Sequence, residues 1–233
     1  MSNDTTTLLS LFGLAQLADS TLPVGSFSFS LGLEGAIEAG MVGTIGELEE
    51  YTIGALYGAA ECDCIALLEA FRSGESGDYA RVIDADLRLM SYKSASEQRS
   101  MTLRMGHRLA DLLRSIAPSS LSNDFYDWIR RELTPGSYPI AQAIAGLTLG
   151  VEERGLYAAH LYGVAQTILS ASLRLMRITH FDTQRILRKL APLCERLYNH
   201  YGELTLEDMT SWSPSLSLAA SLHEKGSGRL FMN

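Results

Sequence analysis

Apolar residues recur at three- and four-residue spacing through nearly the whole chain, which predicts helices rather than strands. No run shows the clean two-residue alternation of a strand, and there is neither a tandem repeat nor a long linker. The pattern therefore predicts an all-α fold, a single-domain bundle of about eight to ten helices over residues 1–233. Helices are expected at 8–19, 31–39, 44–71, 79–92, 96–116, 125–133, 139–150, 152–177 and 181–200.

Local signals mark several helix ends within this pattern. Thr44 followed by Glu47 matches a capping box, so a helix is expected to begin there. Segment 139–150 carries almost no charge and is predicted to be buried on all sides. Pro192 lies inside the last predicted helix, which should be kinked or restarted at that residue.

The end of the chain differs from the rest. From about residue 204 to residue 233 it is rich in serine and has no apolar stripe, which predicts a flexible tail. It nevertheless ends with Leu230 and Phe231 directly after Arg229. Such a pair must pack on its own domain or be captured by a partner, and arginine and aromatic side chains are favoured anchors at interfaces. Both alternatives remain open.

The charge balance narrows the range of partners. With 19 basic and 27 acidic residues the formal net charge is −8, which argues against binding to nucleic acid or to an anionic membrane. No run approaches the roughly 18 apolar residues of a membrane span, and the N-terminus lacks the basic region of a secretory signal. Three cysteines are too few for a disulfide framework. A cytoplasmic location is expected.

Motifs for catalysis are absent from the sequence. It contains no GxxxxGK[ST] phosphate loop, no HExxH and no GxSxG, and its five histidines lack metal-ligand spacing. Cys62 and Cys64 could hold a soft cation, but residues two apart on a regular helix point in nearly opposite directions. The sequence therefore predicts a protein that is not an enzyme, with no cofactor and no metal site of its own.

Two basic clusters have two interpretations each. One comprises Arg99, Arg104, His107 and Arg108, and the other comprises Arg185, Arg188 and Lys189. Each could bind an acidic partner or a phosphate, or could be a solvated helix face paired with nearby acids.

Four ordered segments together resemble one known family. The first is LADSTLPVGSFSFSLGLEGAIEAG, which contains what we term the signature segment, residues 19–34. The others are SEQRSMTLRMGHRLADLL, the stretch from YPIAQAIAGLTLG to LRLMRITHFDTQRIL, and the terminal HEKGSGRLFMN. In this combination they resemble the urease accessory proteins of the UreF type. Phe29, Tyr138 and the Thr179–His180 pair depart from the residues common in the family, and the missing histidines weaken any expectation of direct nickel ligation.

The resemblance implies an all-helical assembly protein that acts by contact. It implies a homodimer, a UreD/UreH-type accessory partner, a UreG-type GTPase whose hydrolysis is modulated, and nickel insertion into the urease apoprotein. The residues expected to bind partners are Pro23, Gly25, Phe27, Ser30, Glu34, His223, Glu224, Arg229, Leu230 and Phe231. In this interpretation the Glu34 carboxylate is offered to a partner cation or a passing metal ion. The alternatives are a nickel-binding metallochaperone and a helical enzyme with a dispersed active site.

Overall fold

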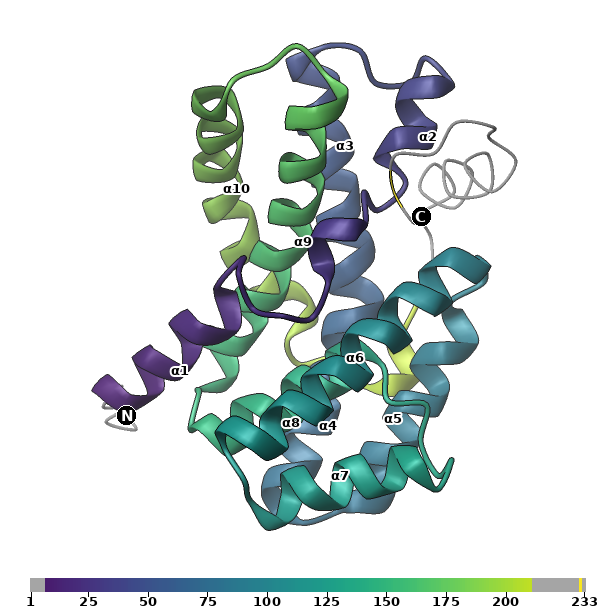
Figure 1. Cartoon of the computed structure of the whole chain (residues 1–233), viewed down its shortest axis with the longest axis vertical. Coiled ribbons are helices and arrows are strands. Elements are labelled where there is room, and N and C mark those ends of the chain that lie inside the picture. Colours follow the sequence, from purple (N-terminus) through teal and green to yellow (C-terminus); the bar gives the residue numbers. More distant parts are fainter. Residues whose placement is uncertain (1–6, 211–230, 232–233) are drawn as a thin grey trace.

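A computed structural model describes residues 7–210 and residue 231, and every regular element in them is helical (Figure 1). The all-α prediction is confirmed. The α-helices are α1 (Leu8–Ala18), α2 (Leu33–Glu38), α3 (Ile45–Gly58), α4 (Ile65–Ser76), α5 (Tyr79–Tyr92), α6 (Ser96–Ile116), α7 (Ser120–Arg130), α8 (Tyr138–Leu149), α9 (Glu153–Leu175) and α10 (His180–Tyr201). Three short elements complete them: η1 (Ser26–Ser28), η2 (Ala59–Cys64) and η3 (Leu206–Asp208).

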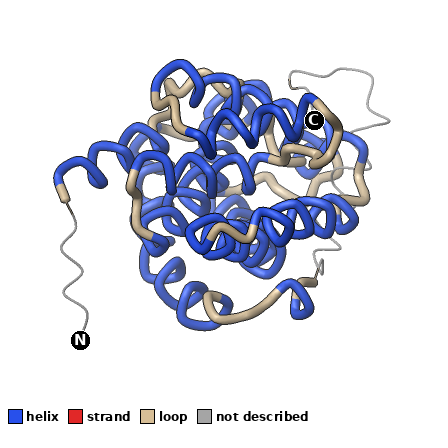
Figure 2. Tube along the Cα trace, turned by 90° about the horizontal axis from the view of Figure 1, so that it is seen from below, coloured by secondary structure: helices blue, strands red, loops and turns tan. Residues whose placement is uncertain are grey.

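The helices form two packed groups along the long axis of the molecule (Figure 1). In one group α3, α9 and α10 pack together, with α2 against α9. In the other, α4 packs against α5 and α8, while α6 packs against α7 and α8. Helix α1 contacts α8 and α9 and projects from the body, as the view from below in Figure 2 also shows. In the described part of the chain, no helix is long and apolar enough to cross a membrane. The cytoplasmic location stays a prediction.

Side-chain caps fix the first residues of helices α3 and α7. The capping box at α3 is confirmed: the Glu47 amide donates to Thr44 Oγ1 at 3.2 Å, and the Thr44 amide donates to Glu47 Oε2 at 2.9 Å. Helix α7 begins earlier than predicted because Ser119 and Ser122 form a reciprocal cap. Serine at both positions satisfies the free amide groups that a helix start exposes.

The predicted helix 44–71 is interrupted by an element that periodicity does not reveal. Helices α3 and α4 are joined through one π-helical segment, η2, which contains both neighbouring cysteines. The wider turn leaves the Glu61 carbonyl available, and it accepts a hydrogen bond from the Thr210 amide at 3.1 Å. Segments of this kind are frequent at functional sites. Helix α10, by contrast, continues through Pro192 and does not restart there.

Segment 204–210, which the sequence assigns to the tail, is packed on the body of the molecule. Leu206 and Met209 are buried, and Thr205 caps η3. The remainder of the predicted tail, except Phe231, lies outside the described residues.

The loop before α8 is organised by one buried carboxylate. Asp86 on α5 is fully buried and accepts hydrogen bonds from Thr134 Oγ1 at 2.6 Å, the Gly136 amide at 2.6 Å and the Ser137 amide at 3.1 Å. Three donors offset the cost of removing a charge from water. They thereby hold the start of α8. The predicted burial of segment 139–150 is confirmed for residues 139–146, whereas residues 147–149 are half-buried and Gly150 is exposed.

Helix α6 approaches this same loop so closely that only glycine fits at position 106. A Cβ atom there would overlap the Gly136 carbonyl oxygen and would lie 2.6 Å from the Ser137 carbonyl carbon. Backbone atoms cannot move aside as a flexible side chain can. Gly54 offers the opposite case, because it is exposed in the middle of α3 and a Cβ atom there would meet nothing within 4 Å.

We expect Gly106→Ala to lower the free energy of unfolding by about 3 kcal/mol or more, because the added methyl group separates α6 from the loop. The matched control Gly54→Ala should raise it by about 0.5–1 kcal/mol, the helix-propensity difference. Urea denaturation followed by circular dichroism measures both. Equal effects of the two substitutions would contradict the close approach.

Candidate functional site

The signature segment is a rigid turn. Asp19 Oδ1 accepts the Thr21 amide at 2.8 Å, and this backbone hydrogen bond lowers the pKa of Asp19. Gly25 has φ +85° and Gly32 has φ +79°, values that L side chains adopt only with strain. Leu31 also has a positive φ, and its carbonyl accepts the Tyr51 hydroxyl hydrogen at 2.7 Å. The segment thus has a defined shape before any partner binds.

Within this segment the predicted residues fall into an exposed and a buried group. Phe27 is 72% exposed and Pro23 is also exposed, so both are available to a partner. Gly25 is half-buried. Ser30 and Glu34 are buried, at 0% and 3% exposure. The Glu34 carboxylate therefore lies inside the protein, where it interacts with its own chain.

The buried Glu34 carboxylate receives the end of the chain. The Phe231 amide donates to Glu34 Oε2 at 3.1 Å, and Phe231 is only 4% exposed. Arg174, near the end of α9, places its guanidinium carbon 4.0 Å from the centre of the Phe231 ring, a cation–π contact. We call Glu34, Arg174 and Phe231 the tail seat.

The tail seat is joined to the exposed part of the signature segment by one further contact. Arg174 Nη2 donates to the Phe27 carbonyl oxygen at 2.9 Å. One guanidinium therefore touches both the terminal aromatic ring and the backbone that presents Phe27. The structure brings Phe27, Glu34 and Phe231 together, whereas His223, Glu224, Arg229 and Leu230 lie outside the described residues.

A cavity of about 220 Å³ opens beside the tail seat. Its walls come from the signature segment, η2, α6, α9 and the start of α8, and both Phe27 and Arg174 line it. The polar groups facing it include Cys62, Asp63, Lys93 and His160.

An ion pair and a thiol lie on the η2 side of this cavity. Lys93 Nζ is 2.7 Å from the Asp63 carboxylate, with the two side chains 17% and 16% exposed. Burial opposes the charge on Lys93, but Asp63 together with Cys62 and Cys64 more than offsets it, so the pKa of Lys93 is raised. Burial raises the pKa of the Cys62 thiol to about 12, so this thiol is protonated at neutral pH. Cys64 is fully buried and does not line the cavity, so the two cysteines point to different places although η2 is not a regular helix.

His160 is the most unusual group in the cavity wall. Its Nδ1 lies 2.6 Å from Gln142 Oε1, an oxygen that can only accept, so Nδ1 carries the proton. Its Nε2 is buried and has no hydrogen-bond partner within the described residues. Burial lowers the pKa of His160 to about 4. The ring is therefore neutral at pH 7 and holds a free lone pair.

Sequence reasoning did not find Arg174, Lys93 or His160 as site residues. Their sequence neighbourhoods are ordinary helix patterns. Arg174 and His160 reach the site because α9 packs against η1 and η2, and Lys93 reaches it because α5 packs against η2. No group of three His, Cys, Asp or Glu side chains in residues 7–210 and 231 could hold a metal ion.

We expect acid to destabilise the protein through His160. Its pKa is about 4 in the folded state and 6.5 ordinarily, so on acidification the unfolded chain takes up a proton that the folded chain excludes. Stability from this group is present above pH 6.5 and is lost as pH falls toward 4. Between pH 7 and pH 5 the loss is about 2 kcal/mol.

Urea denaturation at the two pH values tests this expectation. His160→Gln should lack that part of the pH dependence, whereas His200→Gln, at an exposed position, should keep it. Equal pH dependence in wild type and His160→Gln would contradict the assignment.

The chain is similar to proteins from several bacteria. A family model described as UreF matches residues 42–191. Over 223 residues the chain is 40% identical to "Urease accessory protein UreF 2" of Brucella suis, which covers 96% of this chain and 92% of the relative. It is 37% identical over 223 residues to "Urease accessory protein UreF" of Yersinia enterocolitica, with 96% and 98% covered. Both matches extend over nearly the whole chain.

Proposed function

Because the chain belongs to the UreF family of urease accessory proteins, we propose that it bridges a UreD/UreH-type partner and a UreG-type GTPase during nickel insertion into the urease apoprotein. In this proposal it acts without catalysis, as a homodimer, and modulates GTP hydrolysis by the GTPase. The general role in urease maturation follows from the family. The bridging of the two partners, the homodimer and the modulation of GTP hydrolysis are what we propose.

One observation supports the proposal above the others. The two segments that the sequence singles out, the signature segment and the chain terminus, are far apart in the chain but meet at the tail seat. Arg174 connects the terminal Phe231 to the backbone of the exposed Phe27. A partner that binds one of these segments therefore affects the other. Such coupled contact is what an assembly factor requires.

Phe231 packs on its own domain, so the neighbouring terminal residues Arg229 and Leu230 are proposed to anchor the UreD/UreH-type partner. Deleting residues 226–233 should abolish co-purification with that partner and leave the helical circular dichroism signal unchanged. The removed Phe231 amide leaves Glu34 without one donor, so a modest loss of stability is expected as well. Full capture of the partner by the truncated chain would contradict this part of the proposal.

Phe27 tests the same surface without disturbing the core, because its ring is exposed. We expect Phe27→Ala to weaken binding of the UreD/UreH-type partner by about fivefold or more, as for an interface anchor. The control is Phe12→Ala on α1, where a ring of similar exposure, 78%, is removed. Calorimetric titration of purified proteins measures both. Equal weakening by the two substitutions would exclude a specific role for Phe27.

A metallochaperone that stores nickel is the second candidate, and His160 is the observation that favours it. A buried Nε2 without a hydrogen-bond partner, on a histidine that lines a cavity and whose Nδ1 is held by an acceptor, resembles the arrangement of a metal-ligating histidine. The other residues fit a resident ion poorly, because Cys62 is protonated and Asp63 is already paired with Lys93. Equilibrium dialysis with nickel decides between the two: one tightly bound ion per chain, lost in His160→Ala, would favour storage.

A further inference from the structure

The outer face of α10 has no partner in the described structure. The helix buries Thr183, Ile186, Leu190, Leu193 and Leu197 against the bundle. The opposite face, at the same three- and four-residue spacing, consists of Phe181, Arg185, Arg188, Pro192, Arg196 and Asn199, which are all exposed. We call these six residues the α10 face.

The α10 face is basic although the chain is acidic. Arg185 pairs with Asp182 on its own helix at 3.0 Å, and the nearby Glu195 is paired with Arg154. Arg188 and Arg196 make no ion pair with any residue in 7–210 or with residue 231. Two guanidinium groups without an ion pair among the described residues favour an acidic counterpart over a second basic surface.

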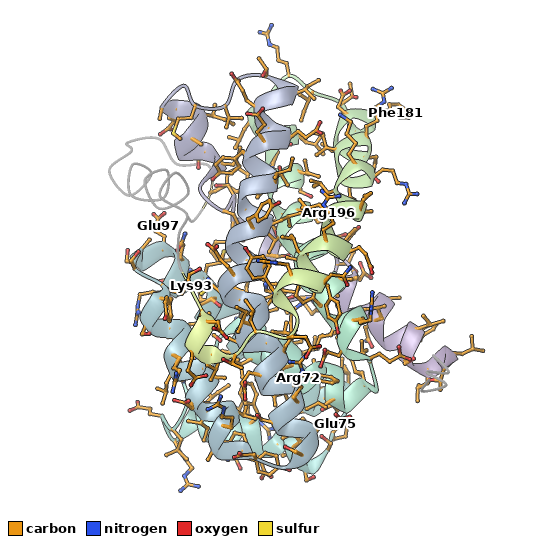
Figure 3. All side chains as sticks on the ribbon, turned by 180° about the vertical axis from the view of Figure 1, so that it is seen from behind. Arg72, Glu75, Lys93, Glu97, Phe181 and Arg196 are labelled. Carbon is orange, nitrogen blue, oxygen red and sulfur yellow. The ribbon has the colours of Figure 1, made fainter. Side chains whose placement is uncertain are left out.

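An aromatic ring stands at one end of this face. Phe181 is 77% exposed at the start of α10 and projects away from the bundle (Figure 3). A phenyl ring gains free energy when a pocket covers it, and aromatic and arginine side chains are the typical anchors of protein interfaces. The net charge of −8 opposes a polyanion such as nucleic acid, and a duplex phosphate backbone would use the arginines but not Phe181. The combination therefore favours a protein over a nucleic acid.

The α10 face is remote from the tail seat. Figures 1 and 3 show α10 on one side of the α3–α9 pair and α2, which carries Glu34, on the other. A protein bound beside the tail seat, at the exposed Phe27, leaves the α10 face accessible. A scaffold that joins two components needs two such separate surfaces.

We propose that the α10 face is a docking surface for an acidic protein surface that offers an apolar pocket to Phe181. This inference rests on the proposed function, and assigns the surface to a component other than the one bound beside the tail seat. Arg188 and Arg196 supply the charge attraction, and Phe181 supplies the apolar anchor.

The experiment measures binding of the full chain, with its UreD/UreH-type partner bound, to the purified UreG-type GTPase and to the purified urease apoprotein. The test variants are Arg188→Glu/Arg196→Glu and Phe181→Ala. The control is Arg130→Glu/Arg131→Glu at the end of α7, which makes the same change in net charge at two exposed arginines. Each pair is measured at low and at high salt.

For one of the two analytes, the double charge reversal should raise the dissociation constant about tenfold or more at low salt. The effect should shrink at high salt because ions screen exposed charges. Phe181→Ala should weaken the same complex about fivefold at both salt concentrations. The control should change binding less than about twofold, since its arginines lie outside the α10 face.

Several results would overturn the proposal. Unchanged binding of both analytes to the test variants would do so, and so would an equal loss in the control. A shift from dimer to monomer on sedimentation of the charge-reversed chain would assign the face to a second copy. Loss of oligonucleotide binding alone would assign it to nucleic acid. If the 226–233 deletion fails to release the UreD/UreH-type partner while the α10 variants behave as expected, the tail proposal fails and this one stands.

Discussion

The buried carboxylate of Glu34 is the constraint around which the functional part of the molecule is arranged. A carboxylate removed from water must find donors, and one of them is the main-chain amide of Phe231, two residues before the end of the chain. The need to satisfy one acid therefore ties the first forty residues to the last few. The Arg174 guanidinium packs on the ring of Phe231 and donates to the carbonyl oxygen of Phe27. The signature segment, helix α9 and Phe231 therefore meet at this one residue.

This arrangement explains how a protein without recognisable catalytic groups can take part in urease maturation. Its exposed distinctive side chains are the Phe27 ring of the signature segment and the arginines and Phe181 of the α10 face, whereas Phe231 is buried against its own chain. Beside them lies a cavity whose histidine is kept neutral by burial. These features are the basis of the proposal that the protein binds more than one component at a time.

The sequence predicts the helices well and the site only in part. Caps such as Thr44 with Glu47 act locally, so the residues near them suffice for prediction. The π-helical segment is invisible to periodicity because it changes the helix by a single residue over a few positions. The resemblance implied that Glu34 offers its carboxylate to a partner or a metal ion, but it is buried and accepts the amide of Phe231, 197 residues further along the chain. Arg174 and His160 acquire their roles only through packing, which no local pattern encodes.

The π-helical segment η2 determines which way the apolar face of α4 points relative to that of α3. Helices α3 and α4 follow one another almost continuously, yet α3 packs against α9 whereas α4 packs against α5 and α8. The extra residue in η2 sets the rotation between those two apolar faces. Removing one residue there would turn α4 by about 100° relative to α3, since each residue advances a helix by that angle. The fully buried Leu67 and Leu68 would then leave the core. The extra residue of η2 therefore fixes the angle at which one group of helices packs relative to the other.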